Sequence, residues 1–419
     1  MSARSGTTGA RPRIVVTGLG AVSPLGLTAR ASYEAARDGV CAIAPVVLDP
    51  GPHGPDTHTT PAAVVSSDLL SATEAALGRR IGASLDAFAL MALGPAHEAL
   101  SAAGLLGHPS LEQRAALVLG HGFAGIHTLE ASYERFFGAK SSRIHPLTVP
   151  KVMVSAPVSA VAMEFKVRGP VFSVSSACAS SGHAIAQGAG FIASGEADVA
   201  IVGGSEAIVT PCCLRAWEGL QAMTASTCRP FSLGRDGMAI GEGGAVMVLE
   251  SLEHAQARGA PILAELVGVG LSSDAFHWTQ PSLEGAVSAM SKALRPAQFG
   301  ADERVLVSTH GTGTPLNDKN EAAALHAVFA ERTLDQPVIA TKSAHGHLIG
   351  AATALQGVIA LTAMNEGLAP PILGFEGRDP DCELDLVLGE ARPVDVAGVL
   401  LNSFAFGGLN TSLAFRRWA

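Results

Sequence analysis

Cys178 is the residue of this chain whose surroundings best fit covalent chemistry. It lies in Val174-Ser-Ser-Ala-Cys-Ala-Ser-Ser-Gly182, between an apolar run typical of a strand and an Ala/Gly-rich run typical of a helix. A helix that begins directly after the cysteine presents free N–H groups and the positive end of its dipole to the thiol. Both favour the thiolate, so the sequence predicts a nucleophile that is reactive near neutral pH. The alternative is a buried cysteine acting as a small hydrophobic residue, which is the commoner case.

Two histidine motifs downstream favour the catalytic interpretation. His310 ends the run Val305-Leu-Val-Ser-Thr-His310, and His347 ends the run Val338-Ile-Ala-Thr-Lys-Ser-Ala-His-Gly-His347. Each run starts as a short aliphatic strand and leads into a Gly-containing turn, so each imidazole is expected on a loop at a strand's C-terminal end. One Cys and two His at three strand ends fit a nucleophile with partners that handle protons and stabilise an oxyanion.

These three segments resemble the β-ketoacyl-acyl carrier protein synthases, the elongating condensing enzymes of the thiolase superfamily. The likeness is to synthase II and to the ketosynthases of type II polyketide systems. Further matches span nearly the whole chain and lie at Arg13–Gly26, Gly203–Ala207, Arg229–Phe231, Arg235–Gly243 and Asn402–Asn410. So many matches in the same order make coincidence a poor explanation.

The resemblance implies an α/β fold, the thiolase fold, in which two similar halves stack as five layers, α-β-α-β-α. Apolar strand-like runs that alternate with Ala-rich helical runs are consistent with a layered architecture. We expect a disordered tail over residues 1–12, an N-terminal half with the nucleophilic Cys over 13–255, and a C-terminal half with both catalytic His over 256–419. The segment Pro45–Pro61, rich in Pro, Gly, His and Thr, is expected to be a surface loop.

Composition excludes several classes of protein. The chain has 419 residues, 48% of them hydrophobic, and its formal net charge of −9 argues against a nucleic-acid-binding protein. No run is long and apolar enough to span a bilayer, and the polar first residues lack the apolar core of a signal peptide. The six cysteines show no zinc-type spacing around histidines, so we expect no metal site and a reducing, cytoplasmic setting.

The resemblance also implies the role of each residue in a decarboxylative Claisen condensation. Cys178 accepts an acyl chain from the phosphopantetheine arm of an acyl carrier protein, and no further cofactor is expected. The backbone N–H groups of Cys178 and Phe406 hold the oxyanion. His310 and His347 hold the thioester oxygen of a malonyl extender while it loses CO₂ and becomes an enolate.

Charged and polar residues near these motifs raise separate questions. Lys342 and Glu321 match the family's structural lysine and its carboxylate partner, with Asp318 as the neighbouring acid. An exposed ion pair would contribute little, but the motif match favours an active-site pair. Gln356 stands where synthase II relatives carry a Glu that helps to hold a monovalent cation, which puts that cation site in doubt. His345 is either a third imidazole at the edge of the site or a solvated neighbour.

Two segments resemble the gating loops of the family. In Phe404-Ala-Phe-Gly-Gly408, Phe406 is the ring expected to block or admit the acyl chain, with Phe404 and Gly407 beside it. The segment Ser273-Asp274-Ala-Phe-His277 resembles the second loop, in which Asp274 is a gate residue. Three threonines match positions that contact the pantetheine arm in relatives, namely Thr279, Thr312 and Thr314.

Two departures from the family change the expected acyl pocket. Phe123 stands where relatives carry Ile, which should shorten the pocket at its floor. Thr148 stands where they carry Phe at the dimer contact, which should open a path towards the neighbouring subunit. A pocket redirected across the interface favours a specialised type II polyketide or polyene pathway, with housekeeping fatty acid synthesis as the alternative.

The resemblance implies two kinds of protein partner. The family is dimeric, with the interface strand just before the nucleophile, here Val171–Val174. We therefore expect a homodimer, or a heterodimer with a homologous chain-length-factor-like subunit, in addition to the acyl carrier protein. Gln221 replaces a basic residue that contacts the carrier in relatives. The alternative docking cations are Arg79, Arg80 and Arg215.

Two other functional classes share this fold and are weighed against an elongating ketosynthase. A non-catalytic partner subunit of the chain-length-factor type lacks the nucleophile, whereas this chain has Cys178 with both histidines. A degradative thiolase typically has a second catalytic cysteine near the C-terminus, and this chain has no cysteine after Cys382. An elongating ketosynthase is therefore the favoured interpretation.

Overall fold

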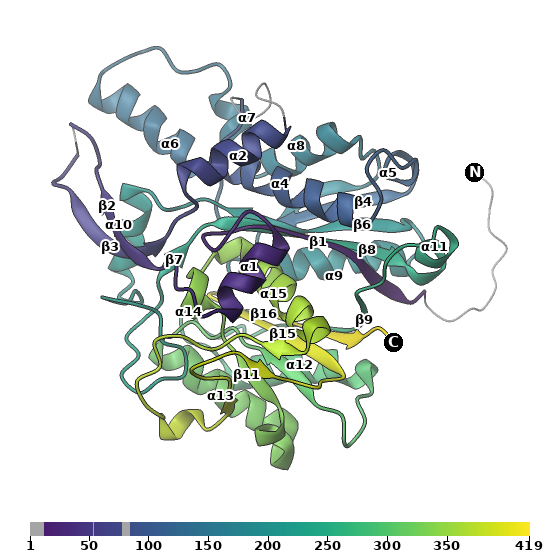
Figure 1. The fold of residues 1–419 in the computed structure, drawn as a ribbon. Helices are drawn as coiled ribbons and strands as arrows, with labels where there is room; N and C mark the ends of the chain where they lie inside the picture. Colours follow the sequence, from purple (N-terminus) through teal and green to yellow (C-terminus); the bar gives the residue numbers. More distant parts are fainter. Residues whose placement is uncertain (1–11, 53, 78–83) are drawn as a thin grey trace.

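Figure 1 shows the computed structural model of the chain, which describes residues 12–52, 54–77 and 84–419. The expected docking cations Arg79 and Arg80 lie outside the described residues, as do residues 1–11 of the expected N-terminal tail. In the part of the chain that the structure describes, no helix combines the length and the apolar character needed to cross a membrane.

The first half of the chain builds a mixed sheet in the order β5-β4-β6-β8-β1. β4 is parallel to β5 and β6, whereas β8 is antiparallel to both β6 and β1. Every residue of β1, β4, β6 and β8 is buried, as expected of a sheet covered by helices on both faces. The strands are β1 (Ile14–Val22), β4 (Ala115–Gly120), β5 (Val171–Val174), β6 (Val199–Glu206) and β8 (Gly243–Ser251).

The second half repeats this arrangement strand for strand. Its sheet has the order β11-β10-β15-β16-β9, with the same pattern of parallel and antiparallel neighbours. This identity of order and direction shows an internal duplication that sequence identity does not reveal. The strands are β9 (Ala264–Ser273), β10 (Val305–Ser308), β11 (Pro337–Ile339), β15 (Gly398–Ala405) and β16 (Leu409–Arg417), and β13 (Asp385–Leu386) extends the outer edge.

Two helices, α9 and α15, lie between the sheets and form a central layer. Glycines let α9 approach both sheets closely: a Cβ on Gly188 would lie 2.2 Å from Val202 of the first sheet, and one on Gly182 would lie 2.3 Å from Thr411 of the second. Where β1 meets β9, three residue pairs join the two sheets at one edge. The central helices are α9 (Ser180–Ala193) and α15 (Ala352–Glu366).

Further helices cover the outer face of each sheet and complete the five layers (Figure 1). On the first sheet, α4 packs directly on β1, since a Cβ on Gly18 or Gly20 would lie 2.1 Å from a carbonyl oxygen of α4. The duplicated α-β-α-β-α fold that the resemblance implied is therefore confirmed. The outer helices are α4 (Ala87–Ala102) and α8 (Ala156–Phe165) on the first half, and α12 (Leu283–Ala297) and α13 (Pro315–Phe329) on the second.

The expectation of a loop over Pro45–Pro61 is wrong at both ends of this segment. The segment contains most of a hairpin of β2 (Ala44–Leu48) and β3 (His58–Ala63), in which Pro45 lies opposite Pro61. Two Val residues of β2 pair with two Thr residues of β3, and such β-branched pairs stabilise a hairpin despite the prolines. β3 also pairs with β7 (Ile240–Gly241) beside the first half.

The remaining elements connect these layers. The boundary expected at residue 255 falls within α11 (Leu252–Ala257), which links β8 to β9. The others are α1 (Ala29–Arg37), α2 (Ser67–Leu77), α5 (Ser110–Gln113), α6 (Ile126–Tyr133), α7 (Thr148–Val152), α10 (Pro211–Gly219), α14 (Lys342–His345), β12 (Leu368–Ala369), β14 (Arg392–Pro393), a π-helical turn at Glu134–Gly138, and 3₁₀ turns at Ala330–Asp335, Ile349–Ala351 and Pro380–Cys382.

Candidate active site

Cys178 lies in the turn between β5 and the central helix α9, as the sequence predicts. Ala177 has a φ of 48°, in the left-handed region that is uncommon for a residue with a side chain. The Oγ of Ser180 stabilises this turn, because it accepts from the N–H of Ser176 at 2.8 Å and donates to the carbonyl of Ala177 at 2.7 Å. The carbonyl of Cys178 accepts from the hydroxyl of Ser403 in β15 at 2.9 Å, so both halves fix the turn.

The Cys178 thiol is buried, and burial raises its pKa to about 11. The charge of Lys342 and the backbone N–H groups of Phe406 and Cys178 lower the pKa, but burial is the larger cause. The prediction of a thiolate near neutral pH is therefore wrong, because burial disfavours the charged form more than Lys342 and the two N–H groups favour it. The same two N–H groups interact with the sulfur, as expected of an oxyanion hole at this atom.

His347 presents an N–H group without a protein partner to the site. Its Nδ1 accepts a hydrogen bond from the backbone N–H of Ile349 at 3.1 Å, so the ring proton of the neutral imidazole is on Nε2. Nε2 is buried and has no hydrogen-bond partner among the described residues. A buried donor without an acceptor is unfavourable unless a ligand supplies one, so this nitrogen is suited to a substrate oxygen.

His310 has the same tautomer for a different reason. The ammonium group of Lys342 donates to Nδ1 of His310 at 3.3 Å, which leaves the ring proton on Nε2. Burial lowers the pKa of both imidazoles well below 6.5, and the positive charge of Lys342 lowers each further. Both rings are therefore neutral at physiological pH and each offers an N–H donor.

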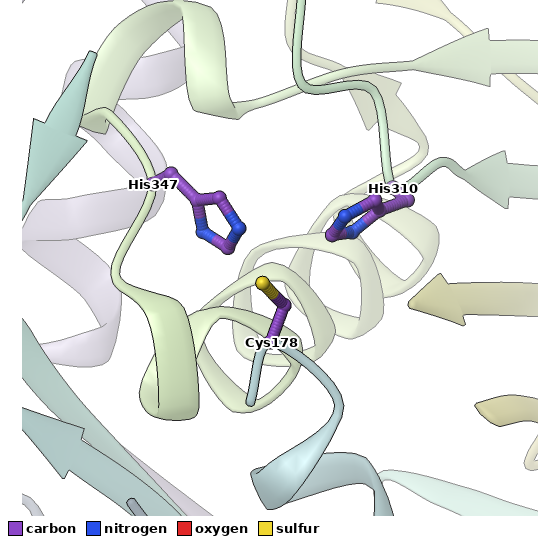
Figure 2. A group of neighbouring side chains, drawn as sticks. All are labelled: Cys178, His310 and His347. Atoms are coloured by element: carbon purple, nitrogen blue, oxygen red, sulfur yellow. The ribbon is translucent and has the colours of Figure 1, made fainter. Parts of the chain in front are cut away.

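The three residues converge on one point. The rings of His310 and His347 are 5.4 Å apart between centroids and almost perpendicular, at 82°. The thiol of Cys178 and one nitrogen of each ring all lie within 4.8 Å of one another. Figure 2 shows both rings on the side of the cysteine from which its sulfur projects. An oxygen that accepts from both imidazoles would lie beside the sulfur.

Lys342 and Glu321 do not form the direct ion pair that we expected. Glu321 accepts from the backbone N–H groups of His310 at 2.8 Å and Gly311 at 2.9 Å, whereas Lys342 donates to the carbonyl of His310. No salt bridge joins the two side chains within the described region of the chain. Burial raises the pKa of Glu321 and lowers that of Lys342. The two groups hold His310 from opposite sides of its backbone.

Two further polar residues support this arrangement. Gln356 accepts from Lys342 at 2.7 Å and donates to the carbonyl of Thr309, so both ends of its amide are used without a cation. Asp318 is buried and accepts from the backbone N–H groups of Phe231 at 2.8 Å and Gly313 at 3.2 Å. Asp318 thus positions the loop after His310.

His345 is neither at the edge of the site nor solvated. It is fully buried, its Nδ1 donates to the carbonyl of Gly346 at 2.8 Å, and its Nε2 accepts from the hydroxyl of Thr341 at 3.0 Å. Burial lowers its pKa to about 3, so the ring is neutral. Both nitrogens are used within the turn that leads to His347, which gives His345 a structural position.

A cavity of about 510 Å³ leads from the surface to Cys178, His310 and His347. Every gate and pantetheine residue predicted from the sequence lines it. These are Asp274, Thr279, Thr312, Thr314, Phe404, Phe406 and Gly407.

The two gating loops are hydrogen-bonded to each other at this cavity. The N–H of Gly407 donates to the carbonyl of Trp278 at 2.7 Å, and the N–H of Asp274 donates to the carbonyl of Gly408 at 2.8 Å. The carboxylate of Asp274 also accepts from the side-chain amide of Asn410 at 2.6 Å. A movement of one loop therefore requires the other to move or these bonds to break.

The two expected pocket residues do not share a cavity. Phe123 packs in the same apolar cluster as Cys178. Thr148 is the first residue of α7 and lines a separate cavity of about 240 Å³ with Thr128 of α6 and Arg135 of the π-helical turn that follows it. Phe123 lines neither this cavity nor the channel to Cys178, so the redirected pocket stays a prediction.

The remaining docking candidate, Arg215, lies on α10 and is exposed. It donates to Glu218 at 3.2 Å and lines a cavity of about 660 Å³ beside the β2–β3 hairpin, apart from the Cys178 channel. Gln221, in contrast, lines the mouth of that channel.

Sequence reasoning missed two residues near the site. Glu206, at the end of β6, is buried and accepts from the N–H groups of Gly122 at 2.7 Å, Phe123 at 3.2 Å and Gly350 at 3.0 Å. Trp217 of α10 packs against Phe406. A Glu at the end of an apolar strand was a visible signal for the first, whereas no sequence pattern marked the second.

A duplicated five-layer α/β fold that brings a cysteine at a helix N-terminus to two neutral imidazoles defines an enzyme of the thiolase fold. The family description "Beta-ketoacyl synthase, N-terminal domain" matches residues 11–255, and "Beta-ketoacyl synthase, C-terminal domain" matches residues 263–376. The chain belongs to the β-ketoacyl synthase family and is an acyltransferase, which confirms the predicted family and enzyme class.

Known relatives cover nearly the whole chain. "Nodulation protein E" of Rhizobium meliloti (strain 1021) is 39% identical over 405 residues, which are 97% of this chain and 99% of that protein. "3-oxoacyl-[acyl-carrier-protein] synthase 2" of Coxiella burnetii is 32% identical over 413 residues, 97% and 98% of the two chains. The solved structure "The ishigamide ketosynthase/chain length factor" superposes with a TM-score of 0.88 at 31% identity, covering 98% of this chain and 100% of that one.

Proposed function

We propose that this protein is an elongating ketosynthase that joins an acyl group on Cys178 to a malonyl extender carried by an acyl carrier protein. The observation that carries the proposal is the convergence of one thiol and one nitrogen of each of two neutral imidazoles within 4.8 Å of one another. A thiol can hold an acyl group, and two N–H donors aimed at one oxygen stabilise an enolate.

In the acyl-transfer step, the sulfur of Cys178 attacks the thioester carbonyl of the acyl carrier protein. The N–H groups of Cys178 and Phe406 stabilise the oxyanion, and the C–S bond to pantetheine then breaks. The proton of the Cys178 thiol ends on the pantetheine thiol. Because burial raises the pKa of Cys178 to about 11, the resting group is the thiol, and it must lose its proton before or during the attack.

In the condensation step, the Nε2–H groups of His310 and His347 hold the thioester oxygen of the malonyl group. The carboxylate leaves as CO₂, and its bonding electrons form the enolate that both donors stabilise. The enolate carbon attacks the acyl carbonyl on Cys178, the C–S bond breaks, and the released thiolate takes one proton from solvent. Lys342 and Glu321 act through the backbone and ring of His310 and are positioning residues.

The test is acyl transfer in the Cys178→Ala variant, followed by mass spectrometry of the intact protein. We expect wild type to gain one acyl group at Cys178 and to release a product longer by two carbons, and the variant to do neither while keeping its fold. Chain elongation by the purified variant, with carrier and partner supplied, would overturn the proposal.

The favoured pathway is a specialised type II polyketide or polyene system. The likeness to the ishigamide ketosynthase/chain length factor supports a homologous partner subunit, and a second copy of this chain is the alternative partner. Among the described residues, β5 is an edge strand and is half-exposed, which suits a dimer interface. The 32% identity to a 3-oxoacyl-[acyl-carrier-protein] synthase 2 supports housekeeping fatty acid synthesis as the second candidate.

The setting proposed for this reaction is a reducing cytoplasm, in keeping with six cysteines that are all free thiols. The proposed mechanism uses the phosphopantetheine arm of the carrier and needs no metal. The cluster of Cys178, His310 and His347 could also hold a metal ion such as Zn²⁺. A metal there would occupy the nucleophile and both donors, so we expect zinc to inhibit condensation.

A further inference from the structure

Three aromatic rings adjoin one another next to Cys178. The ring of Phe406 stacks on the indole of Trp217 with 6.3 Å between centroids and 26° between planes. Trp217 in turn meets Phe123 edge to face at 6.0 Å and 60°. All three belong to the apolar cluster that contains Cys178 and Met238.

The two stacked rings are held very differently. Trp217 is only 7% exposed and projects from α10, whose N-terminus is held by a hydrogen bond from the N–H of Cys213 to Glu130 at 3.1 Å. Phe406 precedes Gly407 and Gly408, whose φ values are 81° and 71°, and a Cβ on Gly407 would meet nothing within 4 Å. Phe406 therefore stands on a loop and is partly exposed, whereas the indole is buried on a helix, so a change at the gate displaces the Phe406 ring before the indole.

Phe406 separates Trp217 from the substrate channel. Phe406 lines the cavity that reaches Cys178, whereas Trp217 does not. The backbone N–H of Phe406 interacts with the sulfur of Cys178, which is the atom that would carry the acyl group. The ring of Phe406 therefore belongs to a residue in direct contact with the acyl position. When the Phe406 ring moves aside to admit an acyl chain, the face of the indole that it covered becomes part of the wall of the acyl pocket.

We propose that Trp217 is a specificity-determining residue whose indole face binds the planar, unsaturated part of an acyl chain on Cys178. This inference rests on the proposed function. Opening the gate removes the stacking contact between two aromatic rings, and aromatic faces pair best with another flat π system in an offset arrangement. A conjugated chain restores such a contact along its length. A saturated chain of the same length presents tetrahedral CH₂ groups and restores less of it.

The test compares two acyl groups of equal length, hexanoyl and 2,4-hexadienoyl, each supplied as a pantetheine thioester. Transfer to Cys178 is followed by mass spectrometry of the intact protein in wild type, Trp217→Leu and Trp217→Phe. Because conjugation makes the dienoyl carbonyl intrinsically less reactive, the quantity compared is the change in the dienoyl-to-hexanoyl rate ratio between variants. We expect Trp217→Leu to lower this ratio about threefold or more relative to wild type, which is within the range for one aromatic pair, and Trp217→Phe to keep most of it.

Two controls keep the result interpretable. Trp418→Phe makes the same substitution at an indole that contacts Arg13 near the C-terminus, and it should leave the ratio unchanged. In a protein with Trp278→Phe and Trp418→Phe, Trp217 is the remaining tryptophan, since the chain has three. Its fluorescence should change more on acylation by the dienoyl group than by the hexanoyl group, which gives a readout that needs no substitution at Trp217.

The outcomes distinguish a failure of the role proposed for Trp217 from a failure of the proposed ketosynthase function. An equal ratio in wild type, Trp217→Phe and Trp217→Leu, with equal fluorescence changes for both acyl groups, would overturn the role of Trp217 and leave the ketosynthase function intact. The absence of any acyl group on Cys178 from either thioester would overturn the proposed function and this inference together.

Discussion

The loop after β4 in the first half and the loop after β10 in the second half are built alike but present different side chains. In each, a buried glutamate accepts hydrogen bonds from two consecutive backbone N–H groups: Glu206 from Gly122 and Phe123, and Glu321 from His310 and Gly311. The first loop presents an aromatic ring to the apolar cluster around Cys178, and the second presents an imidazole to the reacting atoms. The acids come from different elements, Glu206 from the end of β6 and Glu321 from α13, so the two loops share a hydrogen-bonding pattern and not an equivalent glutamate.

The loops after β5 and β11 differ in the same way. The first leads within a few residues to Cys178 and the central helix α9. The second contains α14, from which Lys342 reaches the ring and carbonyl of His310, before it reaches His347 and the central helix α15. The first half therefore supplies the nucleophile in apolar surroundings, and the second supplies neutral donors together with a positive charge.

The largest expected effect concerns the pH dependence of the nucleophile. Because burial raises the pKa of Cys178 to about 11, its thiolate fraction should increase about tenfold per pH unit below that value. Alkylation of Cys178 by iodoacetamide, measured by peptide mass spectrometry, should be about 100-fold faster at pH 9 than at pH 7. Free cysteine in solution, with a pKa of about 8.5, is the reference and should level off near pH 9. A plateau for Cys178 by pH 8 would show that the helix end outweighs burial.

The role of the imidazole N–H donors of His310 and His347 can be tested in a protein that lacks the Cys178 thiol. In Cys178→Gln, the amide should mimic an acylated thiol, so the protein should still decarboxylate malonyl-carrier protein without condensing it. His347→Ala in that background should slow CO₂ release at least about tenfold, since a lost oxyanion donor typically costs more than that. His345→Gln is the matched control, because both nitrogens of His345 bond within the turn. An unchanged rate of CO₂ release would remove His347 from the mechanism.

Replacing each buried glutamate by glutamine tests whether the two loops are held alike. In Glu206→Gln and Glu321→Gln, the new NH₂ group faces backbone N–H donors, and each change should lower the free energy of unfolding by about 1–3 kcal/mol. Chemical denaturation measures this loss. Only Glu321→Gln should also slow CO₂ release markedly, by about threefold or more for a misplaced donor. Equal rates of CO₂ release in the two variants would show that the positioning of a catalytic histidine by Glu321 is not what distinguishes the loops.

The smallest effect is expected at the acyl pocket of the first half. If the acyl chain runs past Thr148 into the partner subunit, Thr148→Phe should shorten the products, because overpacking an occupied cavity costs roughly 1–3 kcal/mol. Phe123→Ile should have the opposite effect by deepening the pocket at its floor. Product lengths are read by mass spectrometry with carrier and partner supplied. An unchanged distribution in Thr148→Phe would end the idea of a redirected pocket.

The sequence was sufficient to predict which residues meet at the site. Cys178, His310 and His347 each follow a strand-like run and precede a turn, and in a layered α/β fold such positions gather at one end of the sheets. The gating loops and the pantetheine threonines were predicted from their likeness to the family's motifs, and all of them line one cavity.

The sequence was not sufficient to predict properties that depend on the three-dimensional surroundings of a residue. The pKa of Cys178 depends on how deeply the thiol is buried, and the helix end alone predicted a shift in the wrong direction. The connection of Lys342 to Glu321 runs through the backbone of His310, whereas a motif shows only the side chains. Trp217 belongs to α10, and only the packing of that helix against the gate reveals its stack with Phe406.

The central helices also determine how the protein is made. α9 is covered on one face by the first sheet and on the other by Thr411 and its neighbours in β16, which follow it far along the chain. At roughly 5–20 residues per second, translation of the stretch from residue 256 to Leu409 takes roughly 10–30 s. During that interval the nascent first half exposes an apolar helix face rich in Gly and Ala. In the folded protein this face is covered only when β16 has been made, so the packing of the central layer couples the two halves.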